Sequence, residues 1–252
     1  MKLHFEKYQA TGNDFVLVDN RNGSINLTVD QIRKICDRKF GVGADGLMLI
    51  EKHPSLDFNL VYYNSDGSQS LCGNGSRAAV RMASALGMIN GKATFNAYDG
   101  KHEAEVGDVI KVKINDVTVG NNSDFINTGS PHVIKFVTGL KDYPVYEEGK
   151  RLRDLKPNGT NVNFVELLPD NTIYVRTYER GVENETLSCG TGVTACALAV
   201  HFKGYSSPVA IKTPGGELSV QFTPHPSGQS VTFHDIFLIG PAKMVFKGDL
   251  EL

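Results

Sequence analysis

Two short segments place a cysteine directly in front of a glycine-rich turn: Cys72-Gly73-Asn74-Gly75 and Cys189-Gly190-Thr191-Gly192. A run of small and apolar residues follows each segment and predicts a buried helix, so each cysteine should lie at a strand-to-helix junction, just before the first helical turn. The first N–H groups of a helix have no partner within the helix, and with the helix dipole they bind anions. The same position lowers the pKa of a thiol from about 8.5 toward neutrality.

A matched pair of such thiols suits a reaction that needs an acid and a base on opposite faces of one carbon. One sulfur, as a thiolate, removes a proton from one face, while the other, as a thiol, delivers a proton to the other face. Proton transfer is most efficient when the pKa of the catalytic group lies near the working pH. The helix N-termini would also favour negative charge that develops beside a bound carboxylate. The pair therefore predicts inversion of a stereocentre by Cys72 and Cys189.

The other two cysteines, Cys36 and Cys196, are interpreted as small buried hydrophobic residues. No cysteine pair has C-x-x-C spacing and no histidine pair has H-E-x-x-H spacing, so we expect no metal site. Four free thiols agree with a reducing compartment.

Apolar alternation predicts many short strands, and only three segments have a strong helical pattern. The first helix, residues 28–39, begins with the capping box Thr28-x-x-Gln31 and should end before Gly41. The other two, residues 75–86 and 191–202, are apolar nearly all round and should be buried. Turns between strands are expected at Asn90-Gly91, Asn158-Gly159 and Pro214-Gly215-Gly216. Strands are expected at residues 15–18, 46–51, 58–63, 109–114, 173–178, 217–222 and 231–239.

The chain contains an internal repeat with an offset of 117 residues. Thr11-Gly12 recurs as Thr128-Gly129, Val16-Leu17 recurs as Val133-Ile134, and the first C-G-x-G segment recurs as the second. We therefore expect an α/β protein with two pseudo-symmetric domains, each a mixed, mostly antiparallel sheet or barrel around a central buried helix. The expected boundaries are residues 1–117, joined by the C-terminal segment 241–252, and residues 118–240.

Composition excludes several classes of function. The chain has 252 residues, 40% hydrophobic and 21% charged, with a formal net charge of −2, which argues against nucleic-acid and membrane partners. Residues 1–15 carry charges where a secretory signal needs an apolar stretch, so we expect a cytoplasmic protein. Residues 41–46 match G-x-G-x-x-G, but they follow a predicted helix and precede a predicted strand, the reverse of a dinucleotide-binding segment.

Several ordered motifs together resemble the diaminopimelate epimerase family over nearly the whole chain. They are Thr11-Gly12-Asn13-Asp14-Phe15, Gly41-Val42-Gly43-Ala44-Asp45-Gly46, Asn64-Ser65-Asp66-Gly67-Ser68, Leu71-Cys72-Gly73-Asn74-Gly75-Ser76-Arg77, Gly129-Ser130-Pro131-His132, Asn161-Val162-Asn163-Phe164, Tyr178-Glu179-Arg180-Gly181 and Glu185-Thr186-Leu187-Ser188-Cys189-Gly190-Thr191-Gly192.

The resemblance implies a cofactor-free epimerase that interconverts LL- and meso-diaminopimelate in lysine and peptidoglycan synthesis, usually as a homodimer that closes over its substrate. It implies that Cys72 and Cys189 are the acid/base groups and that His132 and Glu179 support catalysis. The substrate-binding positions that it implies fall into two groups. The loops that hold the reacting carboxylate match Gly73, Asn74, Gly190 and Thr191, and the residues that hold the distal amino acid end match Asn13, Asn64, Asn161, Glu179 and Arg180.

The chain departs from the family pattern at a few positions. Gly46 stands where many members have Gln, and Ser130 replaces a common Asn. The loop before Cys72 is one residue shorter than usual, and the loop at residues 181–185 is one residue longer. Three alternatives remain: a proline or hydroxyproline racemase, which tends to carry C-G-H-G at the first site; a phenazine-biosynthesis isomerase, which lacks the cysteine pair; and a non-catalytic amino acid binding module.

Overall fold

The computed structural model describes residues 2–120, 123–154 and 158–252, and the chain divides into two compact units. Unit 1 comprises Met1–Val112 with Gly240–Leu252, and unit 2 comprises Lys113–Ile239. The chain passes from one unit to the next inside a strand, β7 (Ile110–Ile114), and not at a separate linker.

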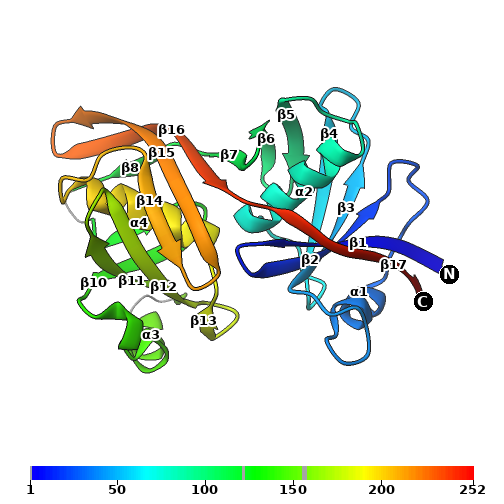
Figure 1. Ribbon diagram of the computed structural model, residues 1–252, viewed down its shortest axis with the longest axis horizontal. Coiled ribbons are helices and arrows are strands. Elements are labelled where there is room, and N and C mark those ends of the chain that lie inside the picture. The colour runs from blue at the N-terminus through cyan, green and yellow to red at the C-terminus, as the bar shows by residue number, and fades with distance from the viewer. Residues whose placement is uncertain (1, 121–122, 155–157) are drawn as a thin grey trace. The chain divides into compact units, whose positions relative to one another are not determined.

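Unit 1 is a mixed, mostly antiparallel sheet. Its strands pair antiparallel in sequence order except for β2–β3 and β4–β5, which are parallel. The C-terminal strand β17 pairs antiparallel with β1, so the two ends of the chain lie side by side in this unit (Figure 1). Besides β7, the strands are β1 (Lys2–Ala10), β2 (Asn13–Asp19), β3 (Gly46–Glu51), β4 (Phe58–Asn64), β5 (Lys92–Ala97), β6 (Gly100–Val106) and β17 (Lys243–Glu251).

Unit 2 repeats this arrangement. Its parallel pairs are β10–β11 and β12–β14, and the neighbouring pairs are antiparallel. The predicted fold, a mixed and mostly antiparallel sheet in each half, is therefore confirmed. The strands are β8 (Val117–Val119), β9 (Phe125–Asn127), β10 (Pro131–Phe136), β11 (Asn161–Leu168), β12 (Thr172–Glu179), β13 (Asn184–Thr186), β14 (Val209–Thr213), β15 (Gly216–Ser227) and β16 (Ser230–Gly240).

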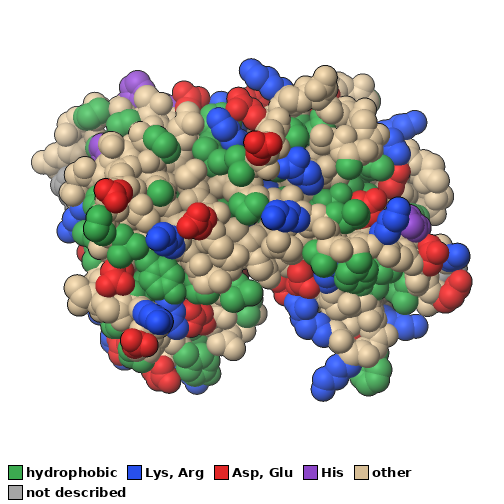
Figure 2. Space-filling view, viewed as in Figure 1, with side chains coloured by type: hydrophobic (Ala, Val, Ile, Leu, Met, Phe, Trp, Pro, Cys, Tyr) green, Lys and Arg blue, Asp and Glu red, His purple; other side chains and the backbone are tan. Residues whose placement is uncertain are grey.

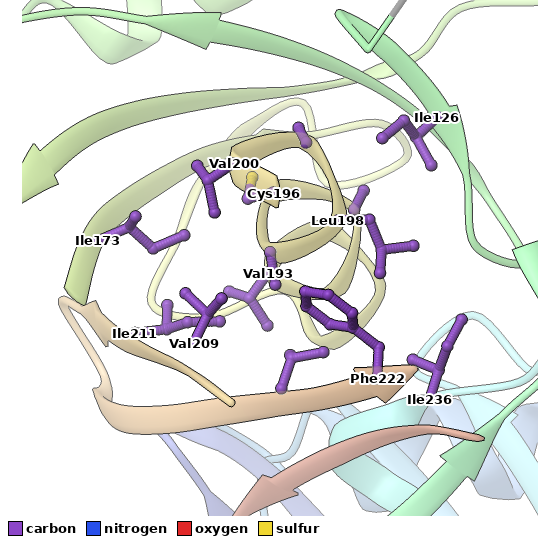
Figure 3. Close-up of a cluster of buried hydrophobic side chains, with 14 of the residues drawn as sticks. Ile126, Ile173, Val193, Cys196, Leu198, Val200, Val209, Ile211, Phe222 and Ile236 are labelled. Atoms are coloured by element: carbon purple, nitrogen blue, oxygen red, sulfur yellow. The ribbon is translucent and has the colours of Figure 1, made fainter. Parts of the chain in front are cut away.

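Each unit buries one helix inside its sheet, as predicted. These central helices are α2 (Gly73–Ala85) and α4 (Gly190–His201), and most of their residues are buried. Around α4, apolar side chains of the helix and of the surrounding strands, among them Ile173, Ile211 and Phe222, form one cluster (Figure 3). Burying each such aliphatic or aromatic side chain contributes roughly 1.5–3 kcal/mol before entropy is counted. The small residues of both helices allow the strands to approach closely.

Both central helices begin earlier than predicted, at Gly73 rather than 75 and at Gly190 rather than 191, because each cysteine is itself the N-cap. The segment before Cys72 also differs from the expected strand. A turn at residues 65–71 separates it from β4, whereas β13 ends at Thr186, shortly before Cys189.

The outer helices show what local pattern reveals and what it does not. The helix α1 (Val29–Cys36) has the predicted capping box at Thr28. It ends at Cys36 and not at Lys39 because the Asp37 carboxylate accepts the N–H groups of residues 39 and 40 and forms a turn. The helix α3 (Val145–Arg153), with a short 3-10 turn at Leu140–Asp142 before it, was not predicted.

The three predicted turns are only partly correct. Pro214-Gly215 connects β14 to β15, with Thr213 paired to Gly216, as expected for a hairpin. Asn90-Gly91 follows α2 and Asn158-Gly159 follows α3, so both connect a helix to a strand.

Side chains of both charges are interspersed over the face shown in Figure 2. No helix in the described part of the chain is long and apolar enough to span a membrane.

Candidate active site

Cys72 is the N-cap of α2, with φ −130° and ψ 111°. The N–H of Gly75 donates to its sulfur over 3.4 Å, so the thiol takes the place of a capping hydroxyl. Met48 packs closely against Gly75, since a Cβ at that position would lie 2.3 Å from the Met48 Cε. The sulfur is thereby held against the first turn of the helix, where a negative charge is favoured.

Two predicted substrate-binding residues lie against Cys72. The Asn13 Oδ1 is 3.6 Å from the Cys72 Sγ and accepts a hydrogen bond from the Asn74 Nδ2 over 3.4 Å. The Asn13 Nδ2 donates to the Asp45 carboxylate, which fixes the orientation of the Asn13 amide. The structure thus brings Cys72, Asn13 and Asn74 together, with Gly73 between Cys72 and Asn74 in the first turn of α2.

The Asp45 carboxylate that binds Asn13 belongs to a cluster of charged side chains. Asp14 accepts from Arg38 over 2.7 Å and pairs with Lys7 over 2.8 Å, while Asp45 also pairs with Arg38 over 2.7 Å. Burial opposes the ionisation of Asp14, but the hydrogen bonds from Arg38 and Lys7 hold its pKa at about 2. Asp14 is therefore ionised near neutral pH and lies between two basic side chains, Lys7 and Arg38.

Asn64 lies at the end of β4, and its amide contacts the hydroxyls of Ser68 and Ser70 at 3.0 and 3.2 Å. Ser70 precedes Cys72 by two residues, so Asn64 is linked to the turn that leads into α2. Gly46, at the start of β3, has no space for a larger side chain, because a Cβ there would lie 2.5 Å from the Tyr62 ring.

Cys189 is the N-cap of α4 and has nearly the backbone conformation of Cys72, with φ −117° and ψ 111°. Its sulfur lies 3.6 Å from the Thr191 hydroxyl. Gly192 has a polar close neighbour in place of Met48, because a Cβ at position 192 would lie 2.4 Å from the Asn163 Oδ1.

His132 contacts the residue that faces Cys189. Its Nε2 lies 2.9 Å from the Thr191 Oγ1 and 2.9 Å from the Ser130 Oγ. Its Nδ1 accepts from the Asn163 Nδ2 over 3.0 Å, so in the neutral ring the Nε2 carries the proton. Burial, with a smaller effect of the Arg180 charge, lowers the pKa of His132 to about 3. His132 is therefore a neutral hydrogen-bond donor to one of these hydroxyls.

Asn161 and Arg180 extend this network, and Glu179 precedes Arg180 in the chain. The Asn161 Nδ2 donates to the Ser130 Oγ over 3.3 Å, and the Asn161 Oδ1 accepts the backbone N–H of Arg180 over 2.9 Å. The Arg180 guanidinium donates to the carbonyl of Asn158 over 3.2 Å. Glu179, at the end of β12, accepts from the Thr186 hydroxyl over 3.0 Å.

Two buried residues of the matching motifs, Asn163 and Arg77, belong to the site although the sequence predicts no role for them. Asn163 is fully buried and orients His132, and its own Oδ1 accepts from Thr177 over 2.9 Å. Arg77 is fully buried in α2, and its Nη2 donates to Asn74 and Thr11 over 3.0 and 3.1 Å. Their residue types could have indicated a role. An arginine within a helix of small residues and an asparagine inside an apolar strand both need buried hydrogen-bond partners.

Within residues 2–120, 123–154 and 158–252, no group of three or more His, Cys, Asp or Glu side chains is placed to hold a metal ion. A thiol at a helix N-terminus, present in each unit with amide or hydroxyl partners, can perform general acid–base chemistry without one.

Comparison with known proteins decides the family. The sequence profile described as diaminopimelate epimerase matches residues 5–120 and 125–245. The chain belongs to the diaminopimelate epimerase family. It is therefore an isomerase of the epimerase type, as the sequence predicted.

Curated relatives in the diaminopimelate epimerase family match over almost their whole length. The diaminopimelate epimerase of Flavobacterium psychrophilum is 46% identical, and the match covers 98% of this chain and 99% of that one. The Chlorobaculum tepidum enzyme of the same name is 40% identical, with 96% and 99% covered.

Solved structures with low sequence identity share the fold. A phenazine biosynthesis protein of the PhzF family from Bacillus anthracis has a TM-score of 0.78 at 14% identity, and the match covers 100% of each chain. A hydroxyproline epimerase from Agrobacterium vitis has a TM-score of 0.68 at 15% identity, covering 99% of this chain and 92% of that chain. These two likenesses concern the fold alone.

Proposed function

We propose that this chain interconverts LL- and meso-diaminopimelate without a cofactor, with Cys72 and Cys189 as acid/base groups on opposite faces of one α-carbon. The observation that carries the proposal is the duplicated N-cap thiol, found in the same backbone conformation at the start of α2 and of α4. The close relatives named for this activity support the choice of substrate.

The reaction needs one proton to leave and one to arrive. A thiolate takes the α-proton and becomes a thiol, and the electron pair of the broken C–H bond remains on the carbon and its carboxylate. The thiol on the other face then donates its proton to that carbon and becomes a thiolate. Atoms and charge balance, and the two sulfurs exchange roles with the direction of the reaction. The first N–H groups of α2 and α4, with Gly73, Asn74, Gly190 and Thr191, are the proposed donors to the reacting carboxylate.

The distal amino acid end of the substrate is proposed to bind Asn13, Asn64, Asn161, Glu179 and Arg180. Arg180 suits a carboxylate, because a guanidinium offers two parallel donors, and Glu179 suits an ammonium group. The asparagine amides can serve either group without adding net charge. His132 would act through Thr191, since its neutral Nε2–H can donate to that hydroxyl 2.9 Å away.

Two further expectations belong to this proposal. We propose a homodimer, which light scattering during size-exclusion chromatography would test, and a location in the cytoplasm. A monomer as the active species in solution would overturn the first.

The activity is tested by incubating the purified protein with LL-diaminopimelate and, separately, L-proline in deuterated water. We expect meso-diaminopimelate that carries deuterium at the inverted carbon and no change in proline. Deuterium in proline would favour the racemase alternative. Binding of diaminopimelate without any exchange would favour the non-catalytic module.

A further inference from the structure

Arg77 is a buried cation in the helix that Cys72 caps. Its side chain is fully buried in α2, five residues after Cys72, and its Nε and Nη1 have no hydrogen-bond partner among the described residues. Burial lowers the pKa of Arg77 to about 10, which leaves the group charged near neutral pH, and the opposite charge of an ionised Cys72 counteracts that decrease. Buried charges are normally compensated by a group of opposite charge.

Arg77 also orients the two amides that lie beside Cys72. Its Nη2 donates to the Asn74 Oδ1 over 3.0 Å, which directs the Asn74 Nδ2 toward the Asn13 Oδ1, 3.4 Å away. The Asn13 Oδ1 in turn lies 3.6 Å from the Cys72 sulfur. This oxygen favours the protonated thiol, but a full charge in a buried site outweighs one long S–H···O contact.

The other charges on elements that pack against α2 do not supply a counter-ion for Arg77. Those nearest to Asn13 form the cluster of charged side chains described above. Glu6 of β1 accepts a hydrogen bond from the Tyr8 hydroxyl over 3.0 Å, and Arg81 of α2 donates to the carbonyls of Gly107 and Asp108. His102 of β6 pairs with Asp99 over 2.7 Å. The titratable tyrosines of these strands are Tyr8, Tyr62 and Tyr63. The remaining titratable groups are at least partly exposed to solvent: Lys2, His4, Asp19, Glu51, Lys101, Glu103 and Glu105.

The central helix of unit 2 has no cation at the equivalent position. The position that matches Arg77 at the repeat offset is Thr194, whose hydroxyl donates to the Gly190 carbonyl over 2.9 Å within α4. The helix α4 contains no Lys or Arg. The contacts of Cys189 lead through Thr191 to His132 instead. Burial lowers the pKa of His132 to about 3 and so keeps this side chain neutral.

We propose that Arg77 is the buried counter-charge of the Cys72 thiolate, and that it makes Cys72 the more acidic of the two thiols. This inference rests on the proposed function in taking Cys72 as an acid/base group. Arg77 is a positioning residue, since it acts through its charge and through Asn74. In the resting enzyme Cys72 is then the base and Cys189 the acid.

The test measures the two thiols separately in one protein. Iodoacetamide alkylation of Cys72 and of Cys189 is followed by peptide mass spectrometry from pH 5 to pH 10, because the rate follows the thiolate fraction. In the unmodified sequence we expect the Cys72 profile to rise at lower pH than the Cys189 profile. Arg77→Met should move the Cys72 profile up by at least about one pH unit, roughly a tenfold lower rate at neutral pH, and leave Cys189 unchanged.

Two matched variants separate charge from packing. Arg77→Lys retains the charge, so its Cys72 profile should lie close to that of the unmodified sequence. Thr11→Val removes a hydrogen-bond partner of Arg77 without changing charge, and it should leave the Cys72 profile unchanged. A folded Arg77→Met protein with a normal Cys72 profile would overturn the proposal. If that variant fails to fold, the unmodified sequence still tests the proposal. A Cys189 profile that rises at lower pH than the Cys72 profile would overturn the proposal equally. Turnover is not the readout, so failure of the proposed function would be seen separately.

Discussion

The two units carry the same backbone plan and different chemistry around their cysteines. In unit 1, Phe15 of β2 lies opposite Gly46 of β3, and in unit 2, His132 of β10 lies opposite Asn161 of β11 in the same parallel register. An apolar ring of the first core is thus replaced by a buried imidazole in the second. Conversely, the first unit buries a guanidinium where the second has a hydroxyl. Duplication preserved the helix N-terminus that favours an anion, while the side chains around it diverged.

The side chain that packs against the first turn of each central helix also differs between the two units. Met48 of β3 lies against Gly75, and Asn163 of β11 lies against Gly192. A thioether end can move within an apolar core, whereas Asn163 is held by Thr177, His132 and the Val133 carbonyl. We therefore expect unit 2 to tolerate a larger side chain at Gly192 less well than unit 1 tolerates one at Gly75.

The largest expected effect comes from removing either thiol. Cys72→Ser and Cys189→Ser should each lower the rate of epimerisation about 10²- to 10⁴-fold, because a hydroxyl is a far weaker acid than a thiol. The rate of meso product formation measures both. Cys36→Ala is the matched control, since burial raises the pKa of Cys36 to about 11 and that thiol has no proposed role. Near-normal turnover of either serine variant would refute the paired-thiol scheme.

The next largest effect concerns His132 and Phe15, which occupy equivalent positions in the two units. His132→Phe should lower kcat about 10- to 100-fold, since Thr191 loses a buried donor and a lost buried hydrogen bond costs about 1–3 kcal/mol. The reciprocal Phe15→His should mainly lower the free energy of unfolding, because the imidazole enters an apolar core. Steady-state kinetics and urea unfolding of both variants separate the two outcomes. An unchanged kcat for His132→Phe would show that Thr191 needs no such donor.

A pH dependence of stability should distinguish unit 2 from unit 1. The pKa of His132 is lowered from 6.5 to about 3 in the folded chain, so below pH 6.5 the unfolded chain binds a proton that the folded chain does not. Stability is thus retained above pH 6.5 and lost as the pH falls toward 3, by about 2 kcal/mol between pH 7 and pH 5.

Urea unfolding at those two pH values, compared between the unmodified chain and His132→Phe, measures this loss. Asp14 titrates equally in both proteins, so its contribution cancels in the comparison. Parallel curves would contradict the low pKa of His132.

The smallest effect compares the two glycines. Gly75→Ala should lower the free energy of unfolding by about 1 kcal/mol, because the Met48 end can shift, whereas Gly192→Ala should lower it by about 2–3 kcal/mol, because the methyl group displaces a hydrogen-bonded Asn163. Thermal or urea unfolding of both variants gives the difference directly. Equal losses would mean that Asn163 moves as freely as Met48.

Elements with a strong local signal were predicted well. The strand β3 has the predicted bounds, 46–51, because its run of apolar residues stops at polar ones, and the capping box of α1 is a purely local feature. The helix α3 was missed because five of its nine residues are charged, and Pro144 before it offers no capping side chain. Its stability comes from packing of Val145 and Leu152 against the β11–β12 cluster, and local pattern does not reveal such contacts.

The candidate site divides in the same way. The sequence by itself determined the two thiols and the helices that follow them, since an N-cap and a glycine-rich first turn are set by neighbouring residues. Only the tertiary structure decided that the Arg77 charge is buried, that His132 is neutral and that Asn163 orients it. Charge state and orientation depend on desolvation and on partners from distant strands, so residue type and spacing do not determine them.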